Sequence, residues 1–270
     1  MTRVGFVGAG RMGLPMVRRL AADGHDVRVL GRSSATRTAL AECGVTAVTD
    51  VTDTGVDADV VVVCVFDDEQ VRDVCLRSGL LEAMPAGSVL VIHTTVDPRT
   101  VEQIRDAALP HDVEVIDAAV SGGPHDIAAG SLSLFVGGTA DALARATVVV
   151  RSYGDPVLHV GSAGNGQRVK LVNNALFAAQ IGLISEAVAL GRQLGIEESA
   201  LLTALPHGSS ASKVMGNIAA RGSVSEFTTA VREFLTKDVA VVRDAVAELG
   251  GDLGALDPAI DAGRPVDAAP

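Results

Sequence analysis

A lysine and two asparagines stand close together in an otherwise apolar stretch of the second half of the chain. The segment 164–174, GNGQRVKLVNN, places Gly166, Lys170 and Asn174 at intervals of four residues, with Asn173 three residues after Lys170. On a helix this spacing puts them on one face. A lysine and an amide among apolar neighbours are candidates for acid/base chemistry. The alternative is a lysine whose stem packs at the helix surface while its charge stays in water.

A serine followed by two glycines forms a second candidate, in DAAVSGGP at residues 117–124. Ser121 supplies a hydroxyl, and Gly122 and Gly123 allow closely spaced backbone N–H groups. Such a set of donors before a helix suits a carboxylate. An ordinary glycine turn uses the same residues, so the segment alone leaves both interpretations open.

The elements that must position these groups begin at the N-terminus, where a short apolar strand, residues 3–7, leads into a glycine-rich loop and a helix from Leu14. Gly8 can turn without a Cβ penalty. Gly10 lets the backbone approach a pyrophosphate, and Gly13 lets the helix pack on the strand. The N–H groups of the first helical turn then face the phosphates. The pattern G-x-G-x-x-G in this context predicts a dinucleotide-binding loop. Its members are Gly8, Ala9, Gly10, Arg11, Met12 and Gly13.

The choice of cofactor depends on the end of the second predicted strand. A NAD-selective site needs an Asp or Glu about 20 residues beyond the glycine loop, to bind the ribose 2′-OH. Gly31 stands at that position, followed by Arg32 and Ser33, with Arg37 nearby. An arginine there can bind a 2′-phosphate and stack on adenine. The segment predicts NADP preference. The alternative is a solvated Arg32 in an enzyme that uses NAD as well.

Two more loops follow predicted strands at the same edge of the sheet, where ligands bind in open α/β folds. Phe66 could border the cofactor, whereas Asp67 is expected to cap the next helix. Thr95 could hydrogen-bond the nicotinamide or its ribose. His93 has no carboxylate beside it in the sequence, so a structural role is expected.

Strand-like and helix-like segments alternate over residues 1 to about 160, which predicts an α/β fold with a doubly wound, parallel Rossmann-type sheet. The expected strands are 3–7, 26–30, 45–48, 59–65, 88–92, 113–117, 132–136 and 156–159. Helices are expected near 12–23, 34–42, 68–75, 98–109 and 139–151. The sheet is expected to be followed by a smaller all-α domain.

That second domain is predicted to begin with a long, widely apolar helix that ends before Gly195. Shorter helices are expected near 197–205, 212–221, 224–235 and 236–249. The predicted domains are therefore a dinucleotide-binding domain over 1–161, a helical domain over 162–254, and an irregular tail over 255–270.

The composition limits the classes of function. The chain has 270 residues, 48% of them hydrophobic, which supports a sizeable core. The net charge of −11 argues against non-specific nucleic-acid binding. The three cysteines fit no metal motif by their spacing, so no metal is expected. A cytoplasmic protein is expected, with no leader before the first strand and no apolar run long enough to span a membrane.

In its motifs the chain resembles the β-hydroxyacid dehydrogenase family, the group of 3-hydroxyisobutyrate dehydrogenase and related semialdehyde reductases. The similarity covers about residues 3–250. It rests on GFVGAGRMG, DAAVSGG, AAGSLSLFVGG, GSAGNGQRVKLVNN and FLTKD, in the family's order and approximate spacing. Imine reductases are similar too, but they usually lack a lysine at the position that matches Lys170.

The resemblance implies a role for each motif. Lys170 would be the catalytic residue, and Asn174 would help to position the substrate and Lys170. Lys237, in the segment FLTKD, would reach the cofactor side of the cleft. The substrate carboxylate would be held by the motif of one serine and two glycines, Ser121, Gly122 and Gly123. Members of the family are typically homodimers or homotetramers.

The sequence departs from the family pattern in three places. The segment 92–95, IHTT, replaces a usual Asp-x-Ser-Thr and leaves Thr95 as the inferred cofactor contact. The segment 208–215 has the family's serines without the aromatic residue that often follows them, so the resemblance does not fix which substrate is preferred. Relatives continue with another helix after a stretch like 248–256, where this chain is rich in glycine, proline and aspartate.

The resulting hypothesis is an NADP-dependent oxidoreductase, with NAD as a possible second cofactor, that acts on a short 3-hydroxy acid or the corresponding semialdehyde. A hydride passes to or from the nicotinamide. In reduction, Lys170 would polarise the carbonyl and protonate the forming alkoxide, and in oxidation it must be neutral. The expected partner is a small carboxylate, with no nucleic acid and no membrane. The alternatives are an imine reductase and a non-catalytic NADP-binding sensor or scaffold.

Overall fold

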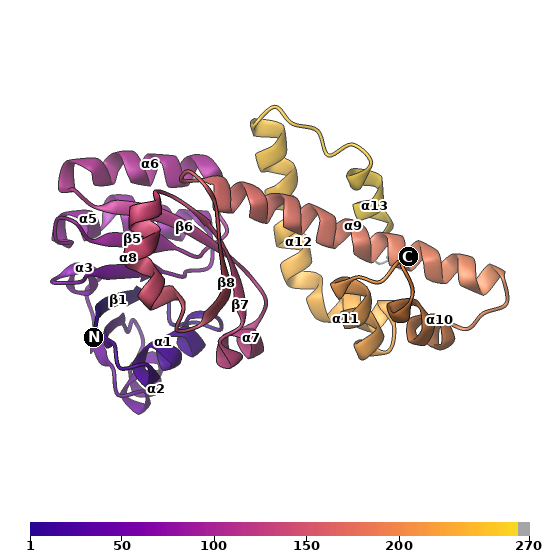
Figure 1. Ribbon diagram of the computed structural model, residues 1–270, viewed down its shortest axis with the longest axis horizontal. Helices are drawn as coiled ribbons and strands as arrows, with labels where there is room; N and C mark the ends of the chain where they lie inside the picture. The colour runs from indigo at the N-terminus through magenta and orange to yellow at the C-terminus, as the bar shows by residue number, and fades with distance from the viewer. Residues whose placement is uncertain (264–270) are drawn as a thin grey trace. The chain divides into compact units, whose positions relative to one another are not determined.

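The computed structural model describes residues 1–263, without the side chains of residues 233 and 234, and is shown in Figure 1. The chain divides into two compact units, one from Met1 to Lys170 and one that begins at Leu171. The division falls within helix α9, Asn165–Gln193. The domain boundary predicted at residue 161 lies just before this helix.

The first unit is built on one sheet of eight strands in the order β3-β2-β1-β4-β5-β6-β7-β8. The strands are β1 Arg3–Val7, β2 Asp26–Leu30, β3 Thr46–Val48, β4 Val60–Val63, β5 Val89–Ile92, β6 Glu114–Ser121, β7 Leu132–Gly137 and β8 Gly154–Gly161. The predicted α/β class is therefore confirmed. Helices α1, α2, α7 and α8 pack on one face of the sheet, and α4, α5 and α6 pack on the other.

One pair of strands corrects the expectation of an all-parallel sheet. β6 and β7 are antiparallel, with Ser121 opposite Ser133 and Asp117 opposite Gly137. The chain between them, residues 122–131, is too short for the crossover of about a dozen or more residues that a parallel pair requires.

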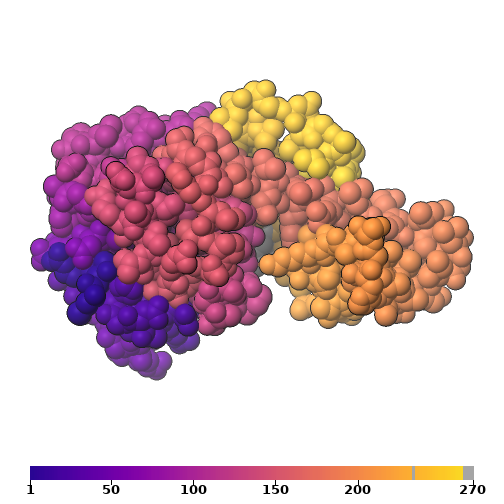
Figure 2. Space-filling model, viewed as in Figure 1, coloured from indigo at the N-terminus to yellow at the C-terminus, as the bar shows by residue number. Residues whose placement is uncertain are grey.

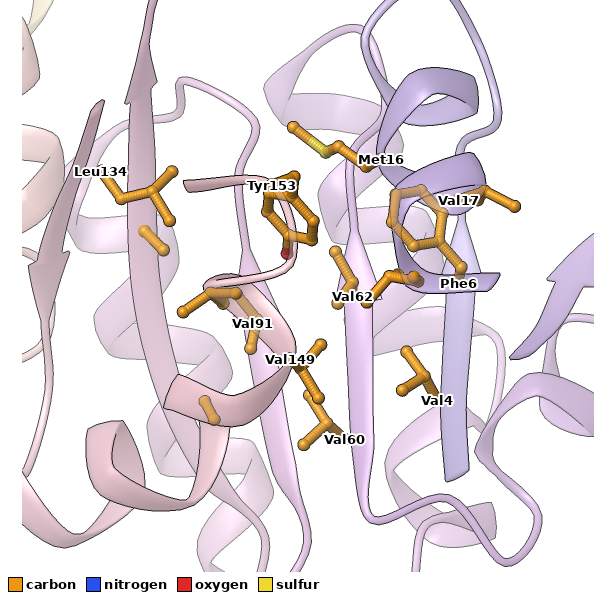
Figure 3. Packing of buried hydrophobic residues seen from close by; sticks show 14 of the residues in the cluster. Val4, Phe6, Met16, Val17, Val60, Val62, Val91, Leu134, Val149 and Tyr153 are labelled. Carbon is orange, nitrogen blue, oxygen red and sulfur yellow. The ribbon is translucent and has the colours of Figure 1, made fainter. Parts of the chain in front are cut away.

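Strand β4 shows how the sheet divides the core. Val60 and Val62 pack into one hydrophobic cluster, and Val61 and Val63 pack into the other. All four are buried, as the uninterrupted valine run predicts for a strand covered on both faces. Figure 3 shows Val60 and Val62 in the first cluster, together with Phe6 of β1.

The helices of the first unit are short and lie between the strands. They are α1 Gly13–Ala22, α2 Ser34–Glu42, α3 Thr52–Gly55, α4 Asp68–Arg72, the π-helical turn η1 Asp73–Arg77, α5 Leu80–Ala83, α6 Pro98–Ala108, the 3₁₀ turn η2 Leu109–His111, α7 Pro124–Ala129 and α8 Ala140–Val150. Ser33, Asp67, Asp97 and Thr139 cap four of them with their side chains. The predicted cap at Asp67 is among these.

The described part of the second unit is helical. It contains α9 from Leu171 on, α10 Glu198–Ala204, the 3₁₀ turn η3 Leu205–His207, α11 Lys213–Arg221, α12 Val224–Glu248 and α13 Leu256–Ala262. α12 replaces the two separate helices expected near 224–235 and 236–249.

Helix α13 corrects the prediction of an irregular tail from residue 255; residues 264–270 lie outside the described residues. Its proline, Pro258, stands in the first turn, where a missing N–H costs nothing. Ile260 is buried, and Arg243 of α12 donates to Asp257 and Asp261 at 2.8 Å each. Asp257, Pro258 and Asp261, which contributed to the expectation of an irregular tail, belong to this short helix, and the two aspartates anchor it through Arg243. In Figure 2 this helix is yellow and lies against α9.

Helix α9 also bears on the expectation that no apolar run could span a membrane. By length and composition alone it is long and apolar enough to do so, and half of its apolar window is buried inside the structure. Long core helices of soluble proteins meet the same two criteria, so one such helix is weak evidence for a membrane span.

The contact between α9 and α13 generates a stability prediction. A Cβ at Gly182 would lie 1.8 Å from the carbonyl oxygen of Ala259, whereas a Cβ at Gly216 of α11 would meet no described atom within 4 Å. Gly182→Ala is expected to lower the free energy of unfolding by about 1–3 kcal/mol because backbone must move. Gly216→Ala is expected to raise it by about 0.5–1 kcal/mol, since alanine loses less entropy on folding. Urea denaturation of both variants measures the difference. Equal effects would contradict the close packing at Gly182.

Candidate functional site

The strand register brings the predicted loops to one edge of the sheet. Val7 of β1 lies opposite Val63 of β4, Val63 lies opposite Ile92 of β5, and Ile92 lies opposite Asp117 of β6. Each strand continues beyond this row into a loop that the sequence selected as a site. β1 also lies at the point where the strand order reverses, between β2 and β4. Ligands bind at such points in doubly wound sheets.

The glycine loop after β1 has the geometry that a pyrophosphate needs. Gly8 has φ +106°, and a Cβ there would lie 2.1 Å from the carbonyl oxygen of Cys64. A Cβ on Gly13 would lie 2.0 Å from the carbonyl oxygen of Gly8, so the start of α1 packs closely on the loop. A Cβ on Gly10, by contrast, would meet no described atom within 4 Å. The loop is tight where it contacts protein and open at its middle glycine, which fits a bound dinucleotide.

The loop after β2 is exposed and basic. Ser33 caps α2 by accepting from the amide N of Thr36 at 3.0 Å, so its hydroxyl already has a structural partner. Arg32 is exposed. The guanidinium of Arg37 donates to the carbonyl of Gly31 at 2.9 Å, and its stem fills the space that a side chain at Gly31 would need. The side chain of Arg37, which carries a positive charge, therefore lies at Gly31, where NAD-selective sites have a carboxylate.

The loops after β4 and β5 are joined through one hydroxyl. Thr94 Oγ1 accepts from the amide N of Val65 and donates to the carbonyl of Val65, both at 3.0 Å. Phe66, next to Val65, is 56% exposed, and Thr95 is half-buried. The two predicted cofactor contacts thus lie on neighbouring, mutually fixed loops.

His93 has the structural role that the sequence suggested. It is buried, with Nδ1 2.6 Å from the carbonyl oxygen of Ala118 and Nε2 2.8 Å from the hydroxyl of Tyr153. Burial lowers the pKa of His93 to about 4. The neutral ring therefore donates from Nδ1 and accepts the tyrosine proton at Nε2. It links β5, β6 and the segment before β8 and does not serve as an acid near neutral pH.

The serine-glycine segment after β6 is partly engaged by its own chain. The amide N of Gly123, the residue before α7, donates to Asp126 Oδ2 in the first turn of that helix at 2.6 Å. Gly122 has φ +137°, and a Cβ there would lie 2.6 Å from the same carboxylate oxygen. The amide of Gly123 therefore already has a partner. The hydroxyl of Ser121 and the amide of Gly122 are the better candidates for donating to a substrate carboxylate.

Asp117 fixes the start of α9. Its fully buried carboxylate accepts from the amide N of Gly164 and from the amide N of Gln167, both at 2.7 Å. Glycines make room for it, because a Cβ on Gly137 or Gly166 would lie 2.5 Å or 2.7 Å from a carboxylate oxygen. Burial raises the pKa of Asp117 to about 6, and the two backbone donors oppose that rise. The sequence had shown Asp117 only as the first residue of a motif.

Sequence reasoning missed Gln167. This residue is fully buried in the first turn of α9, where its side chain donates to the carbonyl of Thr94 at 2.9 Å and accepts from the amide N of Val96 at 3.1 Å. The sequence does contain a signal for it. A glutamine stands close to glycines, three residues before Lys170, at a position that the helical periodicity predicts to be buried.

Helix α9 places Lys170 and Asn174 as the spacing predicted, one turn apart on one face. Lys170 is half-buried. Asn174 is 6% exposed and its Nδ2 is a buried donor with no hydrogen-bond acceptor among the described residues. An unsatisfied buried donor costs about 1–3 kcal/mol, so Nδ2 of Asn174 is a candidate donor to a ligand.

Lys237 lies on α12 in the second unit, and its predicted reach to the cofactor stays a prediction. The second unit also has a hollow of about 400 Å³, lined by α10, η3 and α11 with Leu202, His207 and Gly216 among its residues. None of the predicted site residues lines it. Among residues 1–263, no three His, Cys, Asp or Glu side chains gather as metal ligands do.

Comparison with known proteins gives two matching family models. Residues 3–161 match the model of the NAD binding domain of 6-phosphogluconate dehydrogenase. Residues 164–259 match the model described as NAD-binding of NADP-dependent 3-hydroxyisobutyrate dehydrogenase.

Individual relatives agree with these matches. The chain is 34% identical over 202 residues to 3-hydroxyisobutyrate dehydrogenase of Pseudomonas aeruginosa, which covers 74% of this chain and 68% of the relative. The solved structure of Mycobacterium tuberculosis 3-hydroxyisobutyrate dehydrogenase with L-serine is similar, with a TM-score of 0.86 and 28% identity over 97% of this chain and 92% of that one. An imine reductase from Pseudomonas sp. has a TM-score of 0.66 at 20% identity, over 96% and 91% of the two chains, which is a likeness of fold alone.

The first and the middle glycine of the loop should respond differently to the same substitution. Gly8→Ala is expected to lower the free energy of unfolding by about 1–3 kcal/mol, because of its positive φ and the nearby carbonyl. Gly10→Ala should leave stability within about 0.5 kcal/mol, but weaken NADPH binding at least about tenfold by filling the approach of the pyrophosphate. Thermal unfolding and a fluorescence titration with NADPH measure the pair. Native affinity in Gly10→Ala would place the pyrophosphate elsewhere.

The ionisation of Asp117 contributes to stability in a pH-dependent way. Its folded pKa of about 6 lies above the unfolded value of about 3.9, so the folded state holds this proton more tightly. The stabilisation is present below the unfolded pKa and is lost as the pH rises through the folded one. The difference in free energy of unfolding between the native chain and Asp117→Asn should fall by about 2 kcal/mol between about pH 4 and pH 6.5. Denaturant titrations across this range measure it, and a constant difference would argue against a buried ionisation.

Proposed function

Because this chain belongs to the β-hydroxyacid dehydrogenase family, a family of NAD(P)-dependent oxidoreductases, we propose that it transfers a hydride between NADP(H) and a short 3-hydroxy acid or the corresponding semialdehyde. The observation that carries the proposal is the face of α9 with Lys170 and Asn174 one turn apart. The Nδ2 of Asn174, a buried donor without an acceptor in the part of the chain that the structure describes, supports a substrate oxygen beside the lysine.

The chain's residues divide the binding of the cofactor among four loops, those after β1, β2, β4 and β5. The glycine loop would hold the pyrophosphate at Gly10, where the surface is open. Arg32, with Ser33 in the same loop, would hold the 2′-phosphate. Phe66 and Thr95 would border the nicotinamide and its ribose. When bound there, the cofactor supplies or accepts the hydride.

Lys170 would handle the proton. In the direction of reduction, its ammonium polarises the carbonyl and donates a proton to the oxygen. In the direction of oxidation, the neutral amine accepts that proton, so the rate of oxidation rises with pH. Asn174 would donate to the same oxygen or to a neighbouring one.

The carboxylate of the substrate would bind at the end of β6. The hydroxyl of Ser121 and the amide of Gly122 support this assignment, with Gly123 contributing if its amide exchanges Asp126 for the substrate.

An exposed apolar stripe on α9 supports a homodimer or homotetramer. Val172, Leu176, Leu183 and Leu190 recur at helical spacing and are 46–67% exposed. Covering such a row by a second copy removes it from water. We place the assembled enzyme in the cytoplasm.

Two other functions remain as alternatives. An imine reductase is the enzymatic one, supported by the shared fold and opposed by the presence of Lys170. A non-catalytic NADP-binding sensor or scaffold is the other, opposed by the retained Lys170 and Asn174. Turnover of an aldehyde acid separates both from the proposed function, since the fold alone hosts many activities.

The central experiment is NADPH oxidation with methylmalonate, tartronate and succinic semialdehydes, glyoxylate and one cyclic imine. The native chain should turn over at least one aldehyde acid, and Lys170→Ala should lose about 10²–10⁴-fold in kcat while keeping its affinity for NADPH. Lys170→Arg keeps the charge but cannot take up or release a proton near neutral pH. It should therefore oxidise the hydroxy acid as slowly as Lys170→Ala does. Lys213→Ala, at an exposed position at the start of α11, is the matched control.

The same assay examines the cofactor. Arg32→Ala should raise the KM for NADPH about tenfold or more and leave that for NADH nearly unchanged, because only NADPH carries the 2′-phosphate. Near-native turnover by Lys170→Ala would refute the catalytic assignment. Turnover of the imine alone would make the protein an imine reductase, and tight NADPH binding without turnover would favour the sensor.

A further inference from the structure

The side chain of Gln167 binds both sides of a single loop residue. Its Nε2 donates to the carbonyl of Thr94 and its Oε1 accepts from the amide N of Val96. These two backbone groups flank Thr95. Both ends of the buried carboxamide are thereby satisfied, and such a fully satisfied buried group stabilises one arrangement of the loop.

The loop that Gln167 binds is fixed from the other side as well. The hydroxyl of Thr94 bonds both the amide and the carbonyl of Val65, the residue before Phe66. Gln167 is therefore the side chain through which the loops after β4 and β5 connect to helix α9.

The helix end of this connection is equally fixed. The amide N of Gln167 donates to the buried carboxylate of Asp117, which also binds the amide N of Gly164. Lys170 follows Gln167 by three residues, about 4.5 Å along the helix axis. The backbone of Gln167 is thus held to β6 while its side chain holds the loop that contains Thr95.

We propose that Gln167 is a positioning residue for hydride transfer, which fixes the loop at Thr95 relative to the amine of Lys170. The inference rests on the proposed function, in which Thr95 borders the nicotinamide and Lys170 handles the proton. Such a constellation must be held to within about 0.5 Å, and a misplacement of about 1 Å can cost about 10²-fold in rate. Gln167 therefore affects turnover without touching the reacting atoms.

The test variant is Gln167→Met. Methionine has a similar length and volume, but it leaves the carbonyl of Thr94 and the amide of Val96 without their partner. The kcat for the best aldehyde acid should fall about 10–100-fold. The dissociation constant for NADPH should change less than about threefold, because the glycine loop still binds the pyrophosphate.

Two further readouts separate positioning from a loss of folded protein. With NADPH deuterated at the transferred position, the isotope effect on kcat should rise in Gln167→Met, since slower hydride transfer limits turnover. A smaller folded fraction would lower kcat and leave the isotope effect unchanged. Hydrogen exchange of the Val96 amide in the cofactor-free protein should accelerate, because its acceptor is gone.

The matched control is Val149→Ala. Val149 is fully buried on α8 and packs in the hydrophobic cluster on the other face of the sheet from Val96. The control should melt at a lower temperature because it loses buried methyl groups, while its kcat, isotope effect and Val96 exchange stay at native values.

Each outcome decides a different point. A lower kcat, a larger isotope effect and faster Val96 exchange, all absent in the control, support the inference. Unchanged Val96 exchange, or a kcat that falls only with the folded fraction, overturns it. A native chain that turns over none of the panel overturns the proposed function and the inference with it, whereas an active native chain with an equally active Gln167→Met overturns the inference alone.

Discussion

The arrangement of the candidate site depends on the buried carboxylate of Asp117 at the start of α9. Two amides from the first turn of the helix donate to it, and glycines at 137 and 166 leave the space that it needs. A buried charge without partners would cost several kcal/mol, so the helix has one register in which this charge is satisfied. That register sets where every later residue of α9 points, including Lys170 one turn further on.

A rigid helix attached to a rigid sheet is a good support for proton transfer. The loops that border the predicted nicotinamide site follow β4 and β5. Thr94 hydrogen-bonds one loop to the other, and Gln167 hydrogen-bonds them to α9. These buried polar contacts fix one position of the loops relative to the helix. Surface ion pairs cannot do this, because exposed pairs contribute about 0–1 kcal/mol and tolerate many geometries. This explains why fully buried amide and carboxylate groups gather next to a site rather than at random in the core.

Local signals in the sequence determined the elements and most of the candidate site. Valine runs predicted strands covered on both faces. The glycines of the loop at 8–13 predicted its geometry, because a residue without a Cβ fits the positive φ of Gly8 and the close backbone contact at Gly13. The helical spacing of Lys170 and Asn174 predicted their shared face. Composition misled at the C-terminal end, where glycine and proline indicated an irregular tail and the structure has α13, stabilised by Arg243 with Asp257 and Asp261.

Only the tertiary structure decided which polar groups are partners across the fold. Asp117 and Gln167 are 50 residues apart in the sequence, and nothing local to either one indicates the other. Gln167 likewise binds the carbonyl of Thr94 and the amide N of Val96, which stand 73 and 71 residues earlier in the chain. Sequence periodicity reports which side of an element is buried. It does not report which buried donor meets which acceptor, because that depends on strand order and register.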